Sequence, residues 1–271
     1  LGINKDIWGA FIQDDLITPA NLTFTLGARY DRHDYAVKDL DNPANDKSRF
    51  IANVSPRFGI IFNPADELSI YGNVSQSFKA PEANDMFFGV TSFQANPDIE
   101  PTKSHNIEGG IRFGRGKISV YEINSSKEII FNTYTWKNEN FNTLRRGVEI
   151  SYSYPLTDIL LLSCNYTYNN AVFIGGDYNG KKVPLTPETK YTITLQYSVA
   201  EGLSFKGDLE RIANQYVLND FRNEFPSEDY TTVNAKMIYE RENYSLFIAG
   251  RNIFNEKYSP FTATNGSVVR Y

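Results

Sequence analysis

The stretch Thr189-Lys-Tyr-Thr-Ile-Thr-Leu-Gln-Tyr-Ser-Val199 decides the fold of this chain, because its polar and apolar residues alternate one by one. The apolar side chains are those of Tyr191, Ile193, Leu195, Tyr197 and Val199, and the polar side chains lie between them. A period of two residues places the two kinds of side chain on opposite faces of a β-strand. The stretch therefore predicts a strand with one apolar face and one polar face.

The same alternation recurs along the chain on both sides of this stretch. Leu160 to Asn169, Leu22 to Asp31 and Gly147 to Tyr154 each divide into an apolar and a polar face. The segment 117–131 alternates poorly and is assigned as a strand because of its neighbours. About twelve strands are predicted, near residues 7–15, 21–36, 49–62, 68–79, 104–114, 117–131, 141–154, 159–172, 188–200, 203–217, 229–240 and 243–254.

The predicted connections alternate between short and long. Short turns fall at residues 63–67, 115–116, 155–158, 200–202 and 241–243, and longer loops fall at 37–48, 80–103, 132–140, 173–187 and 218–228. Predicted strands of 12 to 15 residues exceed the roughly 9 to 11 that cross a bilayer. Short turns on one side and long loops on the other are typical of transmembrane β-barrels. The pattern predicts an all-β, antiparallel transmembrane barrel.

The composition agrees with a barrel and excludes several other classes. The chain of 271 residues contains 18 Tyr and 19 Phe, and its mean hydropathy of -0.41 is what a strand with only one lipid-facing side allows. It has no run of 18 apolar residues, which excludes a transmembrane helix. A net charge of -5 argues against a nucleic-acid partner, and Cys164, the single cysteine, indicates neither a disulfide framework nor a zinc site. The first residue is Leu1 rather than Met, so a processed or excised chain is expected.

Several motifs resemble one family of barrels. They are Ser55-Pro-Arg-Phe-Gly59, the segment from Leu68 to Pro81 that ends in Ser-Phe-Lys-Ala-Pro, and Asn96-Pro-Asp-Ile-Glu-Pro-Thr-Lys-Ser104. Gly27-Ala-Arg-Tyr-Asp31, Arg146-Gly-Val-Glu149, Val183-Pro-Leu-Thr-Pro187 and Arg251-Asn-Ile-Phe-Asn-Glu-Lys-Tyr258 continue the likeness. Together they resemble the barrel of TonB-dependent receptors over nearly the whole chain. We interpret these motif residues as architectural rather than chemical, since Pro81 cannot donate to a strand ladder and ends the strand.

The resemblance implies an outer-membrane receptor of a Gram-negative bacterium that imports a scarce nutrient, with a ferric siderophore as the leading class. It implies a 22-stranded barrel around an N-terminal plug, of which residues 1–271 would form about strands ten to twenty-one, without the plug or the last strand. The implied partners are the plug domain, the TonB–ExbB–ExbD complex, and outer-membrane lipid and lipopolysaccharide. No cofactor and no enzymatic activity are expected. Cobalamin, haem or a glycan would suit the same barrel.

Ligand binding is expected at the long loops and the upper lumen, where aromatic side chains gather. The candidate ligand-binding residues are Phe87, Phe88, Phe93, Tyr134, Trp136, Arg145, Tyr178, Phe221, Arg222 and Phe225. Exposed loop aromatics favour a contact surface, and packing of the loops on one another explains each of them equally well. Inward Arg29, Arg57, Arg112, Arg145 and Arg251 could attract an anionic chelate, or form charge ladders with inward Glu108, Glu149 and Asp208.

Two other classes of protein stay open at this point. A passive or enzymatic outer-membrane barrel of twelve strands would need a closing strand within the chain and, for an enzyme, a Ser/His/Asp set. A soluble all-β binding module would pack two sheets around a dry centre. No catalytic set is recognisable, and His33 and His105 lie too far apart in sequence to indicate a metal site.

Overall fold

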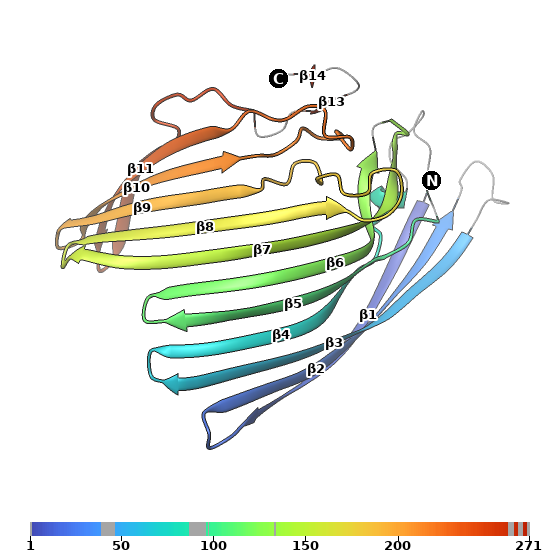
Figure 1. The fold of residues 1–271 in the computed structure, drawn as a ribbon, viewed down its shortest axis with the longest axis horizontal. Coiled ribbons are helices and arrows are strands. Elements are labelled where there is room, and N and C mark those ends of the chain that lie inside the picture. Colours follow the sequence, from blue (N-terminus) through green and yellow to red (C-terminus); the bar gives the residue numbers. More distant parts are fainter. Residues whose placement is uncertain are drawn as a thin grey trace.

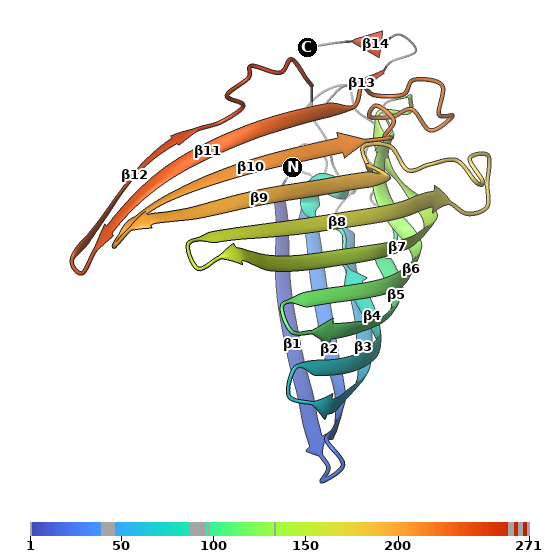
Figure 2. The ribbon, with the colours of Figure 1, turned by 60° about the vertical axis from the view of Figure 1, so that its left-hand side comes forward.

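The computed structural model describes residues 2–38, 47–86, 96, 98–132, 134–259, 263–264 and 268–269. Within these residues, a single sheet of 12 antiparallel strands runs in chain order from β1 to β12, each strand paired with its neighbours in sequence. Figures 1 and 2 show this sheet as a strongly curved wall. The predicted all-β antiparallel architecture is therefore confirmed.

The strands are long, as a membrane-spanning wall requires. Their bounds are β1 (Gly2–Ile17), β2 (Leu22–Lys38), β3 (Lys47–Ala65), β4 (Leu68–Lys79), β5 (Thr102–Phe113), β6 (Gly116–Asn132), β7 (Lys137–Thr157), β8 (Leu160–Phe173), β9 (Thr189–Ala200), β10 (Leu203–Ala213), β11 (Tyr230–Arg241) and β12 (Tyr244–Gly250). A helical turn, α1 (Ala83–Met86), and a small hairpin of β13 (Ala263–Thr264) and β14 (Val268–Val269) complete the order.

Three details differ from the sequence prediction. The loop predicted at 132–140 is mostly strand, because β6 and β7 stay paired up to Asn132 and Lys137. The strand predicted at 203–217 ends at Ala213, and loop backbone follows. The predicted loop 80–103 contains α1, where the amides of Asp85 and Met86 bond to the carbonyl of Glu82.

The two faces of the sheet differ in crowding, and the register shows which residues share a face. Ser104, Ser119 and Thr143 are buried and belong to one face, as do Asn53 and Thr232 on more distant strands. Side chains on the inside of a curved sheet approach one another, so this crowded and polar face is the concave one. A soluble sandwich would instead bury an apolar face.

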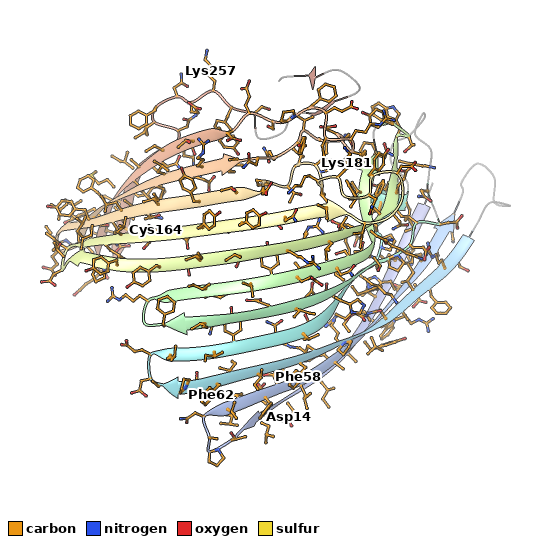
Figure 3. All side chains as sticks on the ribbon, viewed as in Figure 1. Asp14, Phe58, Phe62, Cys164, Lys181 and Lys257 are labelled. Atoms are coloured by element: carbon orange, nitrogen blue, oxygen red, sulfur yellow. The ribbon has the colours of Figure 1, made fainter. Side chains whose placement is uncertain are left out.

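The opposite, convex face carries exposed apolar side chains. Phe58 and Phe62 of β3 are examples, labelled in Figure 3. The same face continues through neighbouring strands as Leu26, Val54, Ile70, Val74, Ile111, Ile118, Ile150, Leu195 and Phe205, all more than a third exposed. An apolar surface this extensive is costly in water and stable against lipid.

The ends of the sheet also differ. Short turns gather at one end, for example at residues 66–67, 114–115 and 201–202, whereas the longer connections gather at the other (Figure 1). Among the described residues β1 and β12 are the two edges and are not paired with each other, so the sheet is open, as expected of part of a larger barrel. No described helix has the length and apolar character needed to cross a membrane.

Candidate functional site at the loop end of the concave face

Charged side chains line the concave face in pairs. The strand register places the predicted inward residues Arg29, Arg57, Arg112 and Arg145 there, together with Glu108, Glu149 and Asp208. Ion pairs join Arg29 to Asp31, Lys117 to Glu108, Lys190 to Glu210 and Lys206 to Asp208. Arg251 follows the end of β12 and is exposed. Most charges of this face therefore neutralise one another, which agrees with the charge-ladder interpretation.

Arg145 forms the most enclosed of these pairs. Its two terminal nitrogens donate to both carboxylate oxygens of Glu128 at 2.8 Å, and one of them also donates to the hydroxyl of Thr143 at 2.8 Å. Thr143 is 0% exposed and its hydroxyl also bonds to Glu128. Bidentate pairing of this kind fixes the position of the guanidinium. Arg145 is thus committed to the wall of the lumen.

A β-bulge creates this arrangement. The β6–β7 register shifts between Ser125 and Glu128, and Lys127 there adopts a positive φ of 58°. The side-chain oxygen of Asn142 accepts a hydrogen bond from the backbone amide of Lys127 at 3.0 Å and so stabilises the bulge. Because a bulge changes the alternation of faces, Glu128 turns inward beside Arg145 instead of outward.

Four aromatic rings form a cluster where the loops leave the strands. Phe141 and Phe173 come from β7 and β8, Tyr178 comes from the loop 174–188, and Phe221 comes from the loop 214–229. Ring centroids lie 5.1 Å apart for Tyr178 and Phe221, 5.4 Å for Phe141 and Phe221, and 5.7 Å for Phe173 and Phe221. Phe221 is only 1% exposed, so this predicted ligand contact packs the loops together.

The two loops are also joined through their backbones. The side-chain oxygen of Asn223 accepts a hydrogen bond from the backbone amide of Lys182 at 2.6 Å, and its side-chain nitrogen donates to the Lys182 carbonyl at 3.0 Å. The amide of Leu185 donates to the carbonyl of Tyr216 at 2.9 Å, and the amide of Glu188 donates to that of Asn214 at 3.0 Å. These contacts make the two loops one folded unit.

Three predicted residues lie at the surface of this unit. Arg222 is exposed, Phe225 is half-buried, and Tyr178 has one side in the aromatic cluster. Burial raises the pKa of the Tyr178 hydroxyl above its ordinary value, and the nearby Arg222 guanidinium partly offsets this. The hydroxyl therefore stays protonated at neutral pH and can donate a hydrogen bond.

Tyr134 and Trp136 lie at the tip of the β6–β7 hairpin. Their side chains are 55% and 50% exposed. Trp136 has a positive φ of 53° and its ring meets that of Phe131 edge-on, with centroids 6.3 Å apart. The side-chain oxygen of Asn132 accepts a hydrogen bond from the backbone amide of Tyr134 at 3.0 Å. The tip thus holds two exposed aromatic side chains on an ordered turn.

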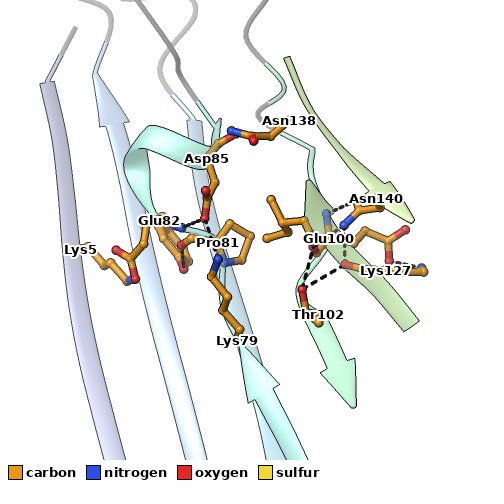
Figure 4. A network of polar contacts seen from close by, with 12 residues as sticks. Lys5, Lys79, Pro81, Glu82, Asp85, Glu100, Thr102, Lys127, Asn138 and Asn140 are labelled. Atoms are coloured by element: carbon orange, nitrogen blue, oxygen red, sulfur yellow. Dashed lines mark hydrogen bonds and ion pairs between the residues drawn. The ribbon is translucent and has the colours of Figure 1, made fainter. Parts of the chain in front are cut away.

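The Ser-Phe-Lys-Ala-Pro motif is anchored by a polar network, drawn in Figure 4. The hydroxyl of Tyr35 donates to the carbonyl of Pro81 at 2.8 Å, and Lys5 reaches Glu82 at 2.9 Å. The side-chain amide of Asn138 donates to the Asp85 carbonyl at 3.0 Å. This network connects β1 and β2 to β7 across the concave side, which supports an architectural role for the motif.

Three predicted residues, Phe87, Phe88 and Phe93, lie outside the described residues. The others gather at the loop end, in the tip, in the aromatic cluster and at Arg145. Glu128 and Asn223 were not predicted, because the bulge and the contact between distant loops leave no local signal in the sequence. His33 and His105 lie on opposite faces of the sheet, and the described part of the chain contains no metal-binding group of His, Cys, Asp and Glu.

Comparison with known proteins identifies relatives of this architecture. The family model described as TonB dependent receptor-like, beta-barrel matches residues 2–253. The iron-regulated outer membrane virulence protein of Vibrio cholerae is 22% identical over 288 residues, which cover 94% of this chain and 42% of that protein. The chain therefore spans less than half the length of this relative.

Two solved structures share the fold. The copper transporter OprC aligns with a TM-score of 0.79 at 18% identity, over 94% of this chain and 42% of that one. The ferric citrate transporter FecA in its unliganded form aligns with a TM-score of 0.76 at 18% identity, over 97% of this chain and 42% of that one.

Proposed function

Because this chain belongs to the TonB-dependent receptor-like β-barrel family, we propose that it forms part of the wall and the ligand-binding mouth of an importer for a ferric chelate of the siderophore class. The family consists of transport receptors of the Gram-negative outer membrane, not enzymes. One observation carries the proposal. At the loop end, the tip of the β6–β7 hairpin and the joined loops 174–188 and 214–229 form a folded rim. This rim carries exposed aromatic residues and adjoins the polar, charge-paired concave face.

The rim has the properties that recognition of a bulky chelate requires. Tyr134 and Trp136 present rigid aromatic surface, which gives large contact area at low conformational cost. Arg222 adds a positive charge on the joined loops, and siderophore complexes are commonly anionic. The names of relatives support a metal-related ligand, since one is iron-regulated, one transports ferric citrate and one transports copper.

Energy would come from outside this chain. We propose that a plug domain closes the lumen and that the TonB–ExbB–ExbD complex acts through it. Paired charges on the concave face, such as Lys117 with Glu108, would offer that plug a hydrated and reversible contact surface. The outward apolar face would contact outer-membrane lipid.

The test uses the full-length receptor in detergent. Binding is measured by calorimetry for a ferric catecholate, a ferric hydroxamate and ferric citrate, and for cyanocobalamin, haemin and an oligosaccharide. We expect at least one ferric chelate to bind. The double variant Tyr134→Ala with Trp136→Ala should weaken it by about 2 kcal/mol, roughly thirtyfold, as at other aromatic hot spots.

The matched control is Tyr154→Ala, since Tyr154 is 52% exposed but lies near the turn end of β7. An equal loss of chelate affinity in the control would show that the rim is not the binding site. Binding of cobalamin, haem or the glycan with no ferric chelate would replace the ligand class. Uptake of radioactive iron that persists in a strain without TonB would contradict the energised mechanism.

A further inference from the structure

On β6, β7 and β8 the convex face carries one polar row near the loop end, next to an apolar band. Toward the loop end, the next residue on this face after Val120 of β6 is Glu122. After Val148 of β7 it is Arg146, and after Tyr168 of β8 it is Asn170. Glu122, Arg146 and Asn170 are direct neighbours in the register. The next row toward the loops is mixed and consists of Asn124, Leu144 and Val172. Because side chains on the turn side of the polar row suit hydrocarbon and those in it need polar surroundings, the polar row fits the level of lipid headgroups.

A shallow hollow of about 450 Å³ straddles this level on β5 to β8. Ile107, Val120 and Val148 line its apolar side, and the row of Glu122, Arg146 and Asn170 lines its polar side. Gly109 contributes no side chain to the convex face. A Cβ there would meet only the Tyr71 carbonyl, at 3.7 Å, so a larger residue would fill the hollow without a backbone clash.

Arg146 is oriented and yet accessible. Its Nε donates to Glu122 Oε2 at 2.7 Å, and the side chain is 63% exposed. With Nε bound to the carboxylate, the two terminal nitrogens remain available, in a planar arrangement that matches two oxygens of a phosphate. Lys182 also lies nearby: its Nζ donates to the Asn170 side-chain oxygen at 2.8 Å and is ion-paired with Glu188 at 3.1 Å, so Arg146 is the cation of this row with donors available.

We propose that this hollow binds a phosphorylated lipid of the outer leaflet. Its phosphate would bind the terminal nitrogens of Arg146, and the start of an acyl chain would lie against Ile107, Val120 and Val148. The position argues for a lipid, because a free anion would leave the apolar side unused and a wholly apolar occupant would leave the terminal nitrogens of Arg146 unused. The site is independent of the imported ligand and lies on the opposite face of the sheet.

The test is native mass spectrometry of the full-length receptor released from detergent. The probes are bisphosphorylated lipid A, the same lipid after phosphatase treatment, and inorganic phosphate. We expect lipid A to bind. Arg146→Ala should weaken it on the order of tenfold or more, which is the loss of one charge-assisted contact. Gly109→Leu should weaken it by closing the hollow.

Arg211→Ala is the matched control. Arg211 lies on the convex face of β10, but its terminal nitrogens bond to Thr231 at 3.2 Å and to Asp229 at 3.0 Å. This control should bind lipid A like the unchanged protein. Arg146→Lys retains the charge without the planar pair of donors and should bind with intermediate strength, so the test stands even where Arg146→Ala folds poorly.

Three results would overturn the proposal. The first is equal binding of dephosphorylated lipid, which would show that the phosphate does not contribute to binding. The second is binding of inorganic phosphate as tight as that of lipid A, which would show that the acyl chain does not contribute. The third is unchanged lipid A binding in Arg146→Ala or Gly109→Leu, or equal loss in Arg211→Ala, which would show that the hollow is not the binding site.

Discussion

Phe221→Ala should detach the loop 214–229 from the loop 174–188 while the barrel wall stays folded. Phe221 is 1% exposed and packs against Phe141, Phe173 and Tyr178 at centroid distances of 5.4, 5.7 and 5.1 Å. Truncation of a buried Phe to Ala costs about 3 to 5 kcal/mol. Because Phe221 comes from the loop 214–229 and packs this loop on Tyr178 and on the loop ends of β7 and β8, we expect this cost to fall on loop docking.

Hydrogen exchange measures that cost directly. The Leu185 amide bonds to the Tyr216 carbonyl, and the Glu188 amide bonds to the Asn214 carbonyl, so both report whether the loops are joined. A loss of about 3 to 5 kcal/mol corresponds to exchange faster by roughly two to three and a half orders of magnitude, at about 1.4 kcal/mol per tenfold. Strand amides of β7 should exchange as before.

The control for this prediction is Phe225→Ala, a change of the same type in the same loop at a half-buried position. It should raise the exchange of these two amides far less than Phe221→Ala does. Unchanged exchange at Leu185 and Glu188 in Phe221→Ala would refute the reasoning, because the loops would then be held by their hydrogen bonds alone. Equally raised exchange throughout β7 would place Phe221 in the wall instead.

Three further changes test the wall and the anchor of the motif. A Cβ in Gly147→Ala would overlap the Tyr121 ring and the Tyr168 carbonyl, so folded yield on heat-modifiable gels should fall sharply, whereas Gly207→Ala, with nothing within 4 Å, should fold normally. Arg145→Met should lower stability by about 1.5 to 3 kcal/mol by leaving Glu128 unpaired, and adding Glu128→Gln should restore part of it, measured by thermal unfolding; a double variant less stable than the single one would argue against the pair. Tyr35→Phe removes a buried hydrogen bond and should cost about 1 kcal/mol, and a thermal midpoint equal to that of the unchanged protein would show that the bond contributes nothing.

The sequence predicted the wall well because side-chain alternation is a local signal. The stretch from Tyr191 to Val199 lies in β9 with its apolar residues on the convex face, and the predicted all-β, antiparallel arrangement agrees with the structure. Segment 117–131 alternates poorly for a reason that only the structure shows. The bulge at Lys127 shifts the alternation within β6. Odd-numbered residues such as Ser125 face the concave side before the bulge, whereas the even-numbered Glu128 faces it afterwards.

The candidate site was less predictable, because its geometry depends on contacts between distant segments. Aromatic residues in the loops 174–188 and 214–229 were identified, yet the sequence cannot distinguish a ring that faces ligand from one that joins two loops. Phe221 joins loops and Tyr134 is exposed, although both are loop aromatics. The pairing of Lys182 with Asn223 spans 41 residues, and no local pattern marks it.

The β6–β7 hairpin explains how the rim keeps a fixed shape. Ile129 packs against the cluster of Tyr35, Ile51, Met86 and Ile99, whereas the next residue, Ile130, packs against the aromatic cluster around Phe221. Successive side chains of a strand point to opposite sides, so the hairpin stands between the two clusters and contacts both. Its tip, with Tyr134 and Trp136, is therefore supported from two sides. A rim held in this way gives up little conformational freedom when a ligand binds, so more of the contact energy remains as affinity.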